Sequence, residues 1–531
     1  MLGCGYIEAL APELILSVTA IVALIFGMFG RGRGSGLIFV VAAAGIAASA
    51  WATLHAAGAD GCLLAGIRLG PMAAYTRLIT LAIGALLLLI CWHLPGAADR
   101  GEFFGMVLFS MAGATLTALA DDLVVLLIAL ELVSMPIYIL VVTGRSDLRT
   151  QEAGVKYFFL GAMASAIMAY GFSFLYGLAG TTAISAAHAG ESASVAQAMV
   201  TQGGNLLLVV GLALSVFGLA FKVAAVPMHF YAADVYEGAA APVTGMLGFA
   251  PKLAGFVALA KLLGAAGGNL PEAIFWLIWG LAATTMAVGN VLALMQSNVK
   301  RILAYSSIAH SGYMLVAVLV GPTIALDSPI RDGAGAMLFY IAIYGATNLG
   351  AFAVVGLLRA KGGEGERLED LAGLSRAHPL IALAMAVCAF SLMGMPPTAG
   401  FIGKVYIFGA ALSLETLDPH KLSMIVLAVI GVLTSAIGAV YYLRIIAACY
   451  LREPEVEVAT VSCGLIKLGV ALAALIVMIA GLLPGQLMSG ARQAAGDIRP
   501  ASRIAAAGER PQVPVGAAPW HRRFPPPAQR R

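Results

Sequence analysis

Residues 218–231 read GLAFKVAAVPMHFY and lie within a long apolar segment. Lys222 places a charge where a membrane helix would carry an apolar side chain, and Pro227 follows five residues later. Proline has no N–H to donate to the preceding turn, so a helix is interrupted there. Backbone groups freed at membrane depth are tolerated only where other protein groups or water satisfy them. The stretch therefore predicts a membrane span that is broken beside a buried cation.

The composition of the whole chain is that of a polytopic membrane protein. Of its 531 residues, 61% are hydrophobic and 11% are charged, whereas about 25% of residues are charged in soluble domains. The net charge of +4 is too small to indicate a nucleic-acid-binding protein. The six cysteines form no CxxC motif, and no GxGxxG or P-loop motif opens a helix. The sequence therefore predicts no zinc, iron–sulfur or dinucleotide site.

Apolar segments long enough to span a membrane recur along the chain. A span needs about 20 mostly apolar residues, and about fourteen segments meet that requirement. The fold class that we expect is an all-α polytopic membrane protein. The expected division is helices 1–3 within 1–102, five helices within 103–264, five within 272–450, a last helix at 464–488 and a tail at 489–531. Prolines and arginines dominate that tail, which predicts a disordered, basic segment.

The loops predict the orientation of the chain in the membrane. Loops after odd-numbered spans hold most of the loop arginines and lysines, whereas loops after even-numbered spans hold only Arg68, Arg331 and Lys421. Cytoplasmic loops carry the excess of basic residues. Both termini are therefore expected on the outer side, and Asp234 and Glu237 are expected at the cytoplasmic mouth.

Four charged residues lie deep inside predicted spans, namely Glu131, Lys222, Lys252 and Lys404. Each costs about 2.5–3.5 kcal/mol at a helix centre on insertion scales, and such residues usually line ion routes. One such residue could simply form a structural ion pair, and a lysine near a helix end, such as Lys261, could snorkel to the interface. Four charges in four central spans favour a transport pathway instead.

A second predicted break supports this interpretation. Pro396 and Pro397 interrupt the span that carries Lys404, and discontinuous helices at the midplane recur in ion sites. Each five-helix block has its fourth span broken, which predicts two inverted repeats. His229 and His310 are possible proton relays, because histidine titrates near neutral pH. His229 could equally satisfy a helix end, and for His310 the favoured interpretation is a hydrogen-bonded core histidine. Asp121 and Asp122 are expected only to cap a helix.

Five stretches together carry a family resemblance: ELVSMPIY, FKVAAVPMHFYAADVYEGAAAPVTGML, QSNVKRILAYSSIAHSGYML, LEDLAGLSRAHP and MPPTAGFIGKVYIF. In this order they resemble the antiporter-like membrane subunits of respiratory complex I. The resemblance covers residues 1 to about 488 and implies about 14 transmembrane helices, with two inverted five-helix repeats and broken helices 7 and 12. It also implies the bacterial inner membrane, with periplasmic termini.

The resemblance assigns roles to particular residues. The family's ionisable residues of helices 5, 7, 8 and 12 fall on Glu131, Lys222, Lys252 and Lys404, and one sister subunit has glutamate at the last position. The implied function is proton translocation. The chain itself would bind no cofactor, and NADH, FMN, iron–sulfur clusters and quinone would belong to partner subunits. The implied partners are the other membrane-arm subunits, together with lipids.

A mechanism and two rival functions follow from these residues. A lysine passes protons only when its pKa comes near the working pH, which burial promotes and a nearby carboxylate opposes. Glu131 would therefore act as a switch that releases the proton of Lys222 towards Lys252, and then Lys404 near the outer side. One rival is a subunit of a sodium or potassium/proton antiporter, in which the same charges would serve. The other is a membrane scaffold without an ion path.

Overall fold

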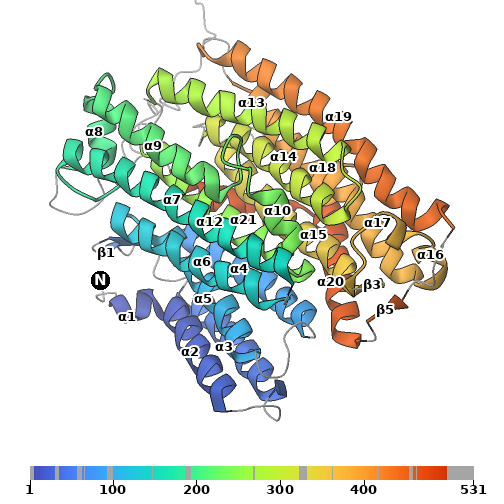
Figure 1. Ribbon diagram of the computed structural model, residues 1–531. Coiled ribbons are helices and arrows are strands. Elements are labelled where there is room, and N and C mark those ends of the chain that lie inside the picture. The colour runs from blue at the N-terminus through green and yellow to red at the C-terminus, as the bar shows by residue number, and fades with distance from the viewer. Residues whose placement is uncertain are drawn as a thin grey trace, which may run out of the picture.

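A computed structural model describes residues 5–29, 35–56, 63–64, 66–92, 100–145, 147–185, 193–266, 270–321, 332–360, 363–414, 418–453, 459–461 and 463–498. These residues form a bundle that is almost entirely helical (Figure 1). Twelve helices are long and apolar enough to cross a membrane, and three shorter apolar helices lie in the two segments predicted to be broken. The all-α membrane fold is therefore confirmed for the described residues. The total of fourteen spans and the inverted repeats stay predictions.

The N-terminal part contains four helices and one short hairpin. Its elements are α1 Tyr6–Ala9, α2 Ala11–Phe29, α3 Ser35–Ala56, β1 Leu63–Leu64, β2 Ile67–Arg68 and α4 Pro71–Cys91. An ion pair that the sequence analysis did not predict joins α2 to α4. Arg77 Nε and Nη2 lie 2.8 Å and 2.6 Å from the two carboxylate oxygens of Glu13, and both side chains are buried. A bidentate contact of this kind between arginine and a carboxylate satisfies both charges away from water.

The first predicted repeat contains the first break. Its elements are α5 Arg100–Leu119, α6 Leu123–Thr143, α7 Leu148–Ala179, α8 Val195–Thr201, α9 Leu206–Lys222, α10 Ala232–Gly238, α11 Ala241–Leu247 and α12 Ala250–Gly264. The helix α9 ends at Lys222, before Pro227. In the break, the N–H of Val226 donates to Thr285 Oγ1 at 2.9 Å. A hydroxyl of the next repeat therefore satisfies a backbone group freed by the break.

The second predicted repeat and the C-terminal part complete the bundle. Their elements are α13 Glu272–Leu294, α14 Val299–Val320, α15 Gly333–Leu357, β3 Leu358–Ala360, β4 Gly363–Glu364, a 3₁₀ turn Glu369–Leu371, α16 Leu374–Ala377, α17 Pro379–Met393, α18 Ala399–Leu412, α19 Lys421–Leu451, β5 Ala459–Thr460, α20 Gly464–Leu482 and α21 Gly485–Gly496. The strands β4, β3 and β5 form a small antiparallel sheet that was not predicted. The second break separates α17 from α18, as the prolines predicted.

The centre of the bundle lies at α11–α12, α14 and α15. In the most apolar stretch of α15 every residue is buried. In the corresponding stretches of α7 and α19 only 33% of the residues are buried. The outer helices present large apolar side chains, among them Phe159 and Leu433, to the surroundings. Polar side chains begin several of the helices, and Asp122, for example, accepts from the N–H of Val124. The helices that carry Lys252 and His310 are therefore, after α15, among the best shielded ones.

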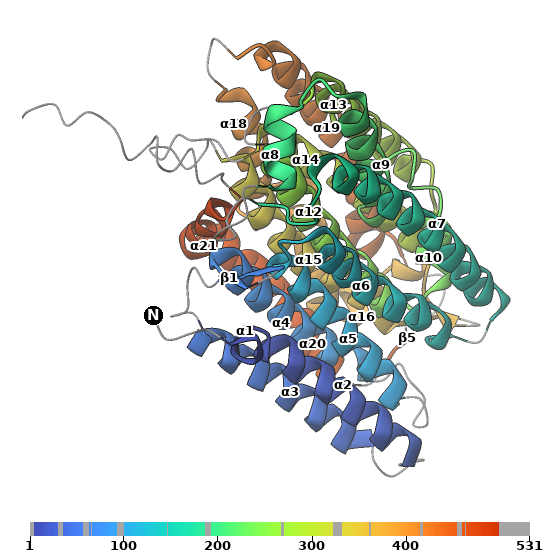
Figure 2. The same ribbon diagram turned by 90° about the vertical axis from the view of Figure 1, so that its left-hand side faces the viewer.

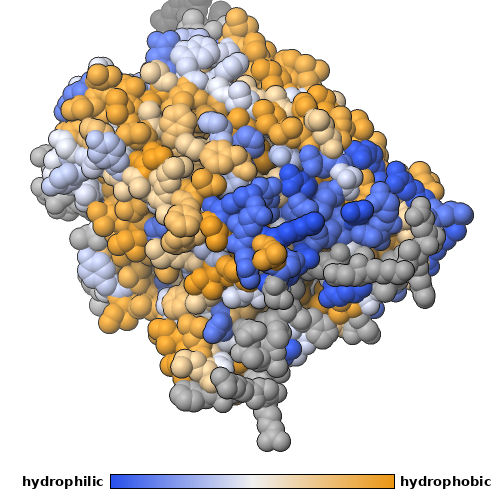
Figure 3. All heavy atoms as spheres, viewed as in Figure 1, coloured by the Kyte–Doolittle hydropathy of each residue, from blue (hydrophilic) through white to orange (hydrophobic). Residues whose placement is uncertain are grey.

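The two ends of the bundle differ in composition. The helices α1, α8 and α21 and the strand β1 lie at one end, and α10, α16 and β5 lie at the other (Figures 1 and 2). The first and last described residues therefore lie at the same end of the bundle. Figure 3 shows a hydrophilic patch over the region of α10, α16 and β3, beside broad hydrophobic areas. We name the end with α10, α16 and β5 the basic-loop end, because Arg145, Arg301 and Arg376 lie there.

The predicted start of a disordered tail at residue 489 is wrong. The helix α21 continues to Gly496, and Ala491, Ala494 and Ala495 are buried. Asp497 Oδ2 then accepts from the N–H of Met72 at 2.8 Å, at the N-terminus of α4. The three alanines are spaced so that they form an apolar stripe along one face of a helix. This pattern was not recognised in the sequence, because the residues that follow are rich in arginine and proline. Residues 499–531 of the predicted tail lie outside the described residues.

We expect residues 490–498 to stabilise the bundle. A chain truncated after Ser489 loses the packed alanines and the carboxylate that caps α4, and the Asp497→Ala change alone should cost about 1 kcal/mol, as for other helix caps. The measurement is the midpoint of thermal unfolding in detergent. A chain truncated after Ile498 is the matched control and should behave as the full-length chain does. Equal midpoints for both truncations would show that residues 490–498 contribute nothing to stability.

Candidate functional site

The predicted ion pair between Glu131 and Lys222 is present. Lys222 is the last residue of α9, where a cation is favoured by the helix dipole. Its Nζ lies 2.8 Å from Glu131 Oε1 and 2.8 Å from Ser134 Oγ. Ser165 donates a short hydrogen bond to the same carboxylate oxygen. The lysine side chain is 2% exposed and that of Glu131 is 23% exposed. The Glu131 carboxylate is therefore the more accessible member of the pair.

Lys252 lies in a different environment, which is built from hydroxyl and carbonyl oxygens of α14. Its Nζ lies 2.6 Å from Ser307 Oγ and 2.8 Å from Ser311 Oγ, and it also donates to the backbone carbonyl of Ser307. The residue is 1% exposed. Ser307 and Ser311 are four residues apart on one helix, so their hydroxyls face the lysine together. Neutral oxygens stabilise the ammonium less than a carboxylate would.

His310 lies on the same helix between these two serines and is also buried. Its Nδ1 lies 2.6 Å from the hydroxyl of Tyr340, and its Nε2 lies 2.9 Å from the hydroxyl of Tyr442. Tyr442 also shares a short hydrogen bond with Ser306. A neutral imidazole with phenols on both nitrogens can accept a proton on one side and donate one on the other.

Lys404 lies beyond the second break. Its Nζ donates to the carbonyl of Met393 at 2.9 Å and to Ser435 Oγ at 2.7 Å, and it lies 5.1 Å from the ring centroid of Tyr313. The Met393 carbonyl is available because α17 ends there. Gly394 has φ +85°, and a Cβ at this position would lie 2.8 Å from the lysine stem. Only glycine therefore fits both the turn and the passing side chain.

Tyrosines extend the polar chain around Lys404. The hydroxyl of Tyr313 accepts from Asn290 Nδ2 at 2.9 Å, and Asn290 Oδ1 accepts from the hydroxyl of Tyr441 at 2.9 Å. The rings of His310 and Tyr313 meet edge to face at 5.6 Å. Lys252, His310 and Lys404 are therefore successive buried protonatable groups, and the ring of Tyr313 contacts both His310 and Lys404.

The matches to known proteins cover the same part of the chain. The model of the family described as "NADH:quinone oxidoreductase/Mrp antiporter, TM" matches residues 120–438. The chain belongs to this family. The resemblance inferred from the five sequence stretches is thereby confirmed.

Two curated relatives within the family cover nearly the whole chain. "NADH-quinone oxidoreductase subunit N" of Trichlorobacter lovleyi is 37% identical over 92% of this chain and 96% of its own length. The protein of the same name from Rhodospirillum rubrum is 38% identical over 91% and 96%.

Solved structures of this fold come from different complexes. A chain of respiratory complex I from Thermus thermophilus is 30% identical, with a TM-score of 0.73 over 90% of this chain and 98% of that chain. A chain of the Mrp complex from Dietzia sp. is 21% identical, with a TM-score of 0.76 over 95% and 99%. The second likeness shows a shared fold alone.

The remaining predicted candidates lie outside the polar chain. His229 is half-buried in the first break, and no described residue pairs with its Nδ1. Asp122 caps α6, as expected. Asp121 accepts from Ser185 Oγ at 2.6 Å. Lys261, which was expected to snorkel, instead donates to the carbonyl of Ala120 at 2.7 Å.

The sequence analysis missed most of the hydroxyl partners. Ser307 and Ser311 had a usable signal, because SSIAHSGY places hydroxyls one helical turn apart inside an apolar span. Ser134 also had one, because it lies three residues after Glu131 on the same helical face, whereas Ser165 had none. Arg77 was overlooked within a predicted span, although its partner Glu13 lies only a few residues into another.

We expect Glu131 to become neutral when its partner is removed. In Lys222→Met, an unpaired carboxylate in low-dielectric surroundings takes up a proton rather than remain charged. Infrared difference spectra should then show the carbonyl band of a protonated carboxyl group, and the additional change Glu131→Gln should remove it. Lys467→Met, at an exposed position of α20, serves as the control without such a band. A spectrum of Lys222→Met identical to the control would contradict this role of the pair.

Proposed function

We propose that the chain is a proton-translocating membrane-arm subunit of an NADH:quinone oxidoreductase. Relatives of nearly the same length carry the name NADH-quinone oxidoreductase subunit N. The observation that carries the mechanism is the series of protonatable groups from Glu131 and Lys222 through Lys252 and His310 to Lys404. All of them except the half-buried Glu131 are buried. Such groups inside a membrane protein mark ion routes by default.

The first step of the proposed mechanism is the opening of the ion pair. While Glu131 lies 2.8 Å from Lys222, the carboxylate favours the protonated lysine. When the pair opens, the lysine loses that stabilisation and releases its proton. The broken segment beside it, residues 223–231, gives the proton a route that no continuous helix offers. Glu131 thus acts as the switch and Lys222 as the carrier.

Later steps use hydroxyls and an imidazole. Lys252 donates to Ser307 and Ser311, which can pass a proton because a hydroxyl both donates and accepts. His310 then offers a protonatable nitrogen between two phenols. Lys404 receives the proton beyond the second break and passes it to the side of the membrane that holds the termini. His229 is a possible relay at the first break.

The chemistry that drives this transfer belongs to partner subunits in our proposal. We assign NADH, FMN, iron–sulfur clusters and quinone to those subunits, because this sequence carries no dinucleotide, P-loop or CxxC motif. Coupling must then reach the chain through conformation or electrostatics. We further propose a bacterial inner membrane location, periplasmic termini, and contacts with the other membrane-arm subunits and with lipids.

A subunit of a sodium or potassium/proton antiporter is the second candidate. The favouring observation is the shared fold with a chain of the Mrp complex from Dietzia sp.. The two functions differ in their ion requirement. NADH-driven proton uptake in inverted vesicles that persists at full rate without sodium or potassium favours the first function, and a strict requirement for either cation favours the second.

We predict that proton transfer at Lys404 depends on its ability to release a proton. Arginine keeps the charge but does not deprotonate in proteins, whereas glutamate reverses the charge and still titrates. The expected order of proton uptake in inverted vesicles, at matched NADH oxidation rates, is wild type, then Lys404→Glu, then Lys404→Arg. Removing one acid–base group typically slows proton transfer by about 10²–10⁴-fold.

The exposed Lys467 of α20 provides the matched control for this series. Lys467→Arg should pump like wild type. Normal pumping by Lys404→Arg would make Lys404 a fixed charge, and the release of protons would then have to be assigned to another residue.

A further inference from the structure

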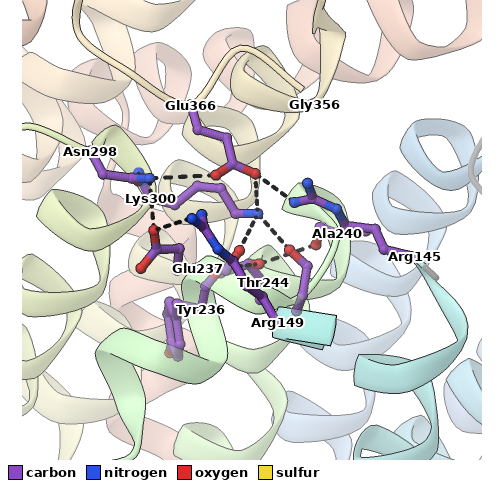
Figure 4. A network of polar contacts seen from close by, with 12 residues as sticks. Arg145, Arg149, Tyr236, Glu237, Ala240, Thr244, Asn298, Lys300, Gly356 and Glu366 are labelled. Atoms are coloured by element: carbon purple, nitrogen blue, oxygen red, sulfur yellow. Dashed lines mark hydrogen bonds and ion pairs between the residues drawn. The ribbon is translucent and has the colours of Figure 1, made fainter. Parts of the chain in front are cut away.

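An ionic network at the basic-loop end surrounds Lys300 (Figure 4). Its Nζ lies 3.1 Å from Glu366 Oε1 and donates to the backbone carbonyls of Glu237 at 2.9 Å and Ala239 at 2.5 Å. Arg145 Nη1 lies 2.5 Å from the same Glu366 oxygen. The lysine side chain is fully buried, whereas that of Glu366 is 15% exposed. We name these residues, together with Asn298, the Lys300 network.

The network joins three separate parts of the chain. Arg145 follows α6, Lys300 lies in the first turn of α14, and Glu366 lies between β4 and the 3₁₀ turn. Asn298 Nδ2 lies 3.4 Å from both Glu237 Oε1 and Glu366 Oε2. Burial raises the pKa of Glu366, but Lys300 and Arg145 outweigh that effect and hold the pKa below its ordinary value. Glu366 is therefore an ionised anchor rather than a proton acceptor.

Glu237 is the more open carboxylate at this end. Its side chain is 22% exposed, and its Oε2 lies 2.7 Å from Arg301 Nη1. Its Oε1 lies 3.8 Å from Arg149, whose side chain is 79% exposed. Glu237 thus lies at the border between the aqueous face and the Lys300 network. The sequence analysis expected it at the cytoplasmic mouth.

Tyr236, the neighbour of Glu237 on α10, faces the opposite direction. It is 2% exposed, and its hydroxyl lies 3.3 Å from Ser307 Oγ. That same serine oxygen lies 2.6 Å from Lys252 Nζ. The backbone carbonyl of Tyr236 accepts from the hydroxyl of Thr244 at 3.1 Å, and this contact fixes the end of α10. Glu237 and Tyr236 are adjacent in the chain. Glu237 lies at the border of the aqueous face, and Tyr236 contacts Ser307, the partner of the buried Lys252.

We propose that Tyr236 is a further proton-relaying residue, which delivers protons from the basic-loop end to Lys252 through Ser307. The inference rests on the proposed function, and it adds the route by which Lys252 is reloaded. A phenol and a serine hydroxyl both donate and accept, so they can pass a proton without storing charge. Neither group was predicted from the sequence.

The transfer balances as a chain of hydrogen-bond exchanges. A hydronium ion of the bulk water, drawn to the aqueous face beside the Glu237 carboxylate, brings the proton to Tyr236. The phenol oxygen accepts a proton from that ion while its own proton moves to Ser307 Oγ. Ser307 in turn gives its proton to the neutral amine of Lys252, after that lysine has passed its own proton on. Every hydroxyl regains one proton, and the only net change is one proton moved.

The experiment uses the complete complex in proteoliposomes. Tyr236→Phe removes the hydroxyl but keeps the ring that packs edge to face against Phe352 at 6.0 Å. We expect proton transfer through this chain to slow by about 10²-fold or more, as for other relays, so the protons moved per NADH fall. Tyr75→Phe is the control, because its hydroxyl only donates to the carbonyl of Leu338 at 3.3 Å. Both variants should assemble as wild type on native gels.

A double substitution separates a relay from a packing role. If Tyr236 acts through Ser307, Tyr236→Phe combined with Ser307→Ala should pump no worse than the poorer single variant, since residues in one path are not additive. A larger solvent deuterium isotope effect in Tyr236→Phe is also expected, whereas loss of packing would leave it unchanged. Additive losses, or a wild-type proton yield in Tyr236→Phe, overturn the relay.

Lys252→Met distinguishes this inference from the function on which it rests. If Lys252→Met stops pumping and Tyr236→Phe pumps normally, only the uptake route is wrong. If Lys252→Met itself pumps like wild type, the proposed function of the buried lysines fails first.

Discussion

An ammonium group held away from water must be surrounded by oxygen atoms, and the arrangement of this bundle follows from that constraint. Lys222, Lys252 and Lys404 each meet this requirement with different oxygen atoms. Lys222 uses the carboxylate of Glu131 and two serines, Lys252 uses oxygens of one neighbouring helix, and Lys404 uses a carbonyl at the end of α17. The three sites therefore stabilise the charged lysine to different degrees, and a proton can move between sites whose affinities differ.

The breaks and the lysines depend on each other. In a continuous helix most carbonyls already accept an N–H of the helix itself, so a carbonyl at a helix end is more readily offered to an ammonium. The carbonyl of Met393 is free to meet Lys404 because α17 stops at Met393, and Gly394 turns the chain there. At the first break Lys222 lies in the last turn of α9, and its partners are side chains of α6 and α7. Helix interruption thus supplies a ligand to the buried cation at the second break.

The sequence predicted the helices, the breaks and the buried charges, since each leaves a local signal in hydropathy, proline or lysine. It did not predict which hydroxyls surround the charges. Tyr340 and Tyr442 meet His310 from two other helices, and the rotation of helices relative to one another leaves no mark in one sequence. The boundary of the tail was missed for a different reason. The segment that contains Ala491 and Ala494 was assigned to the disordered tail, because the chain that follows it is rich in proline and arginine.

The hydrogen bond from the N–H of Val226 to Thr285 has a consequence for the architecture as a whole. The first half of the chain contains an amide at its broken span that is satisfied by a hydroxyl of the second half. The first half therefore does not supply every hydrogen-bond partner that its own backbone requires. A single side chain thus holds the two halves together at the depth of the first break. Loss of the Thr285 hydroxyl would leave the amide of Val226 without this partner.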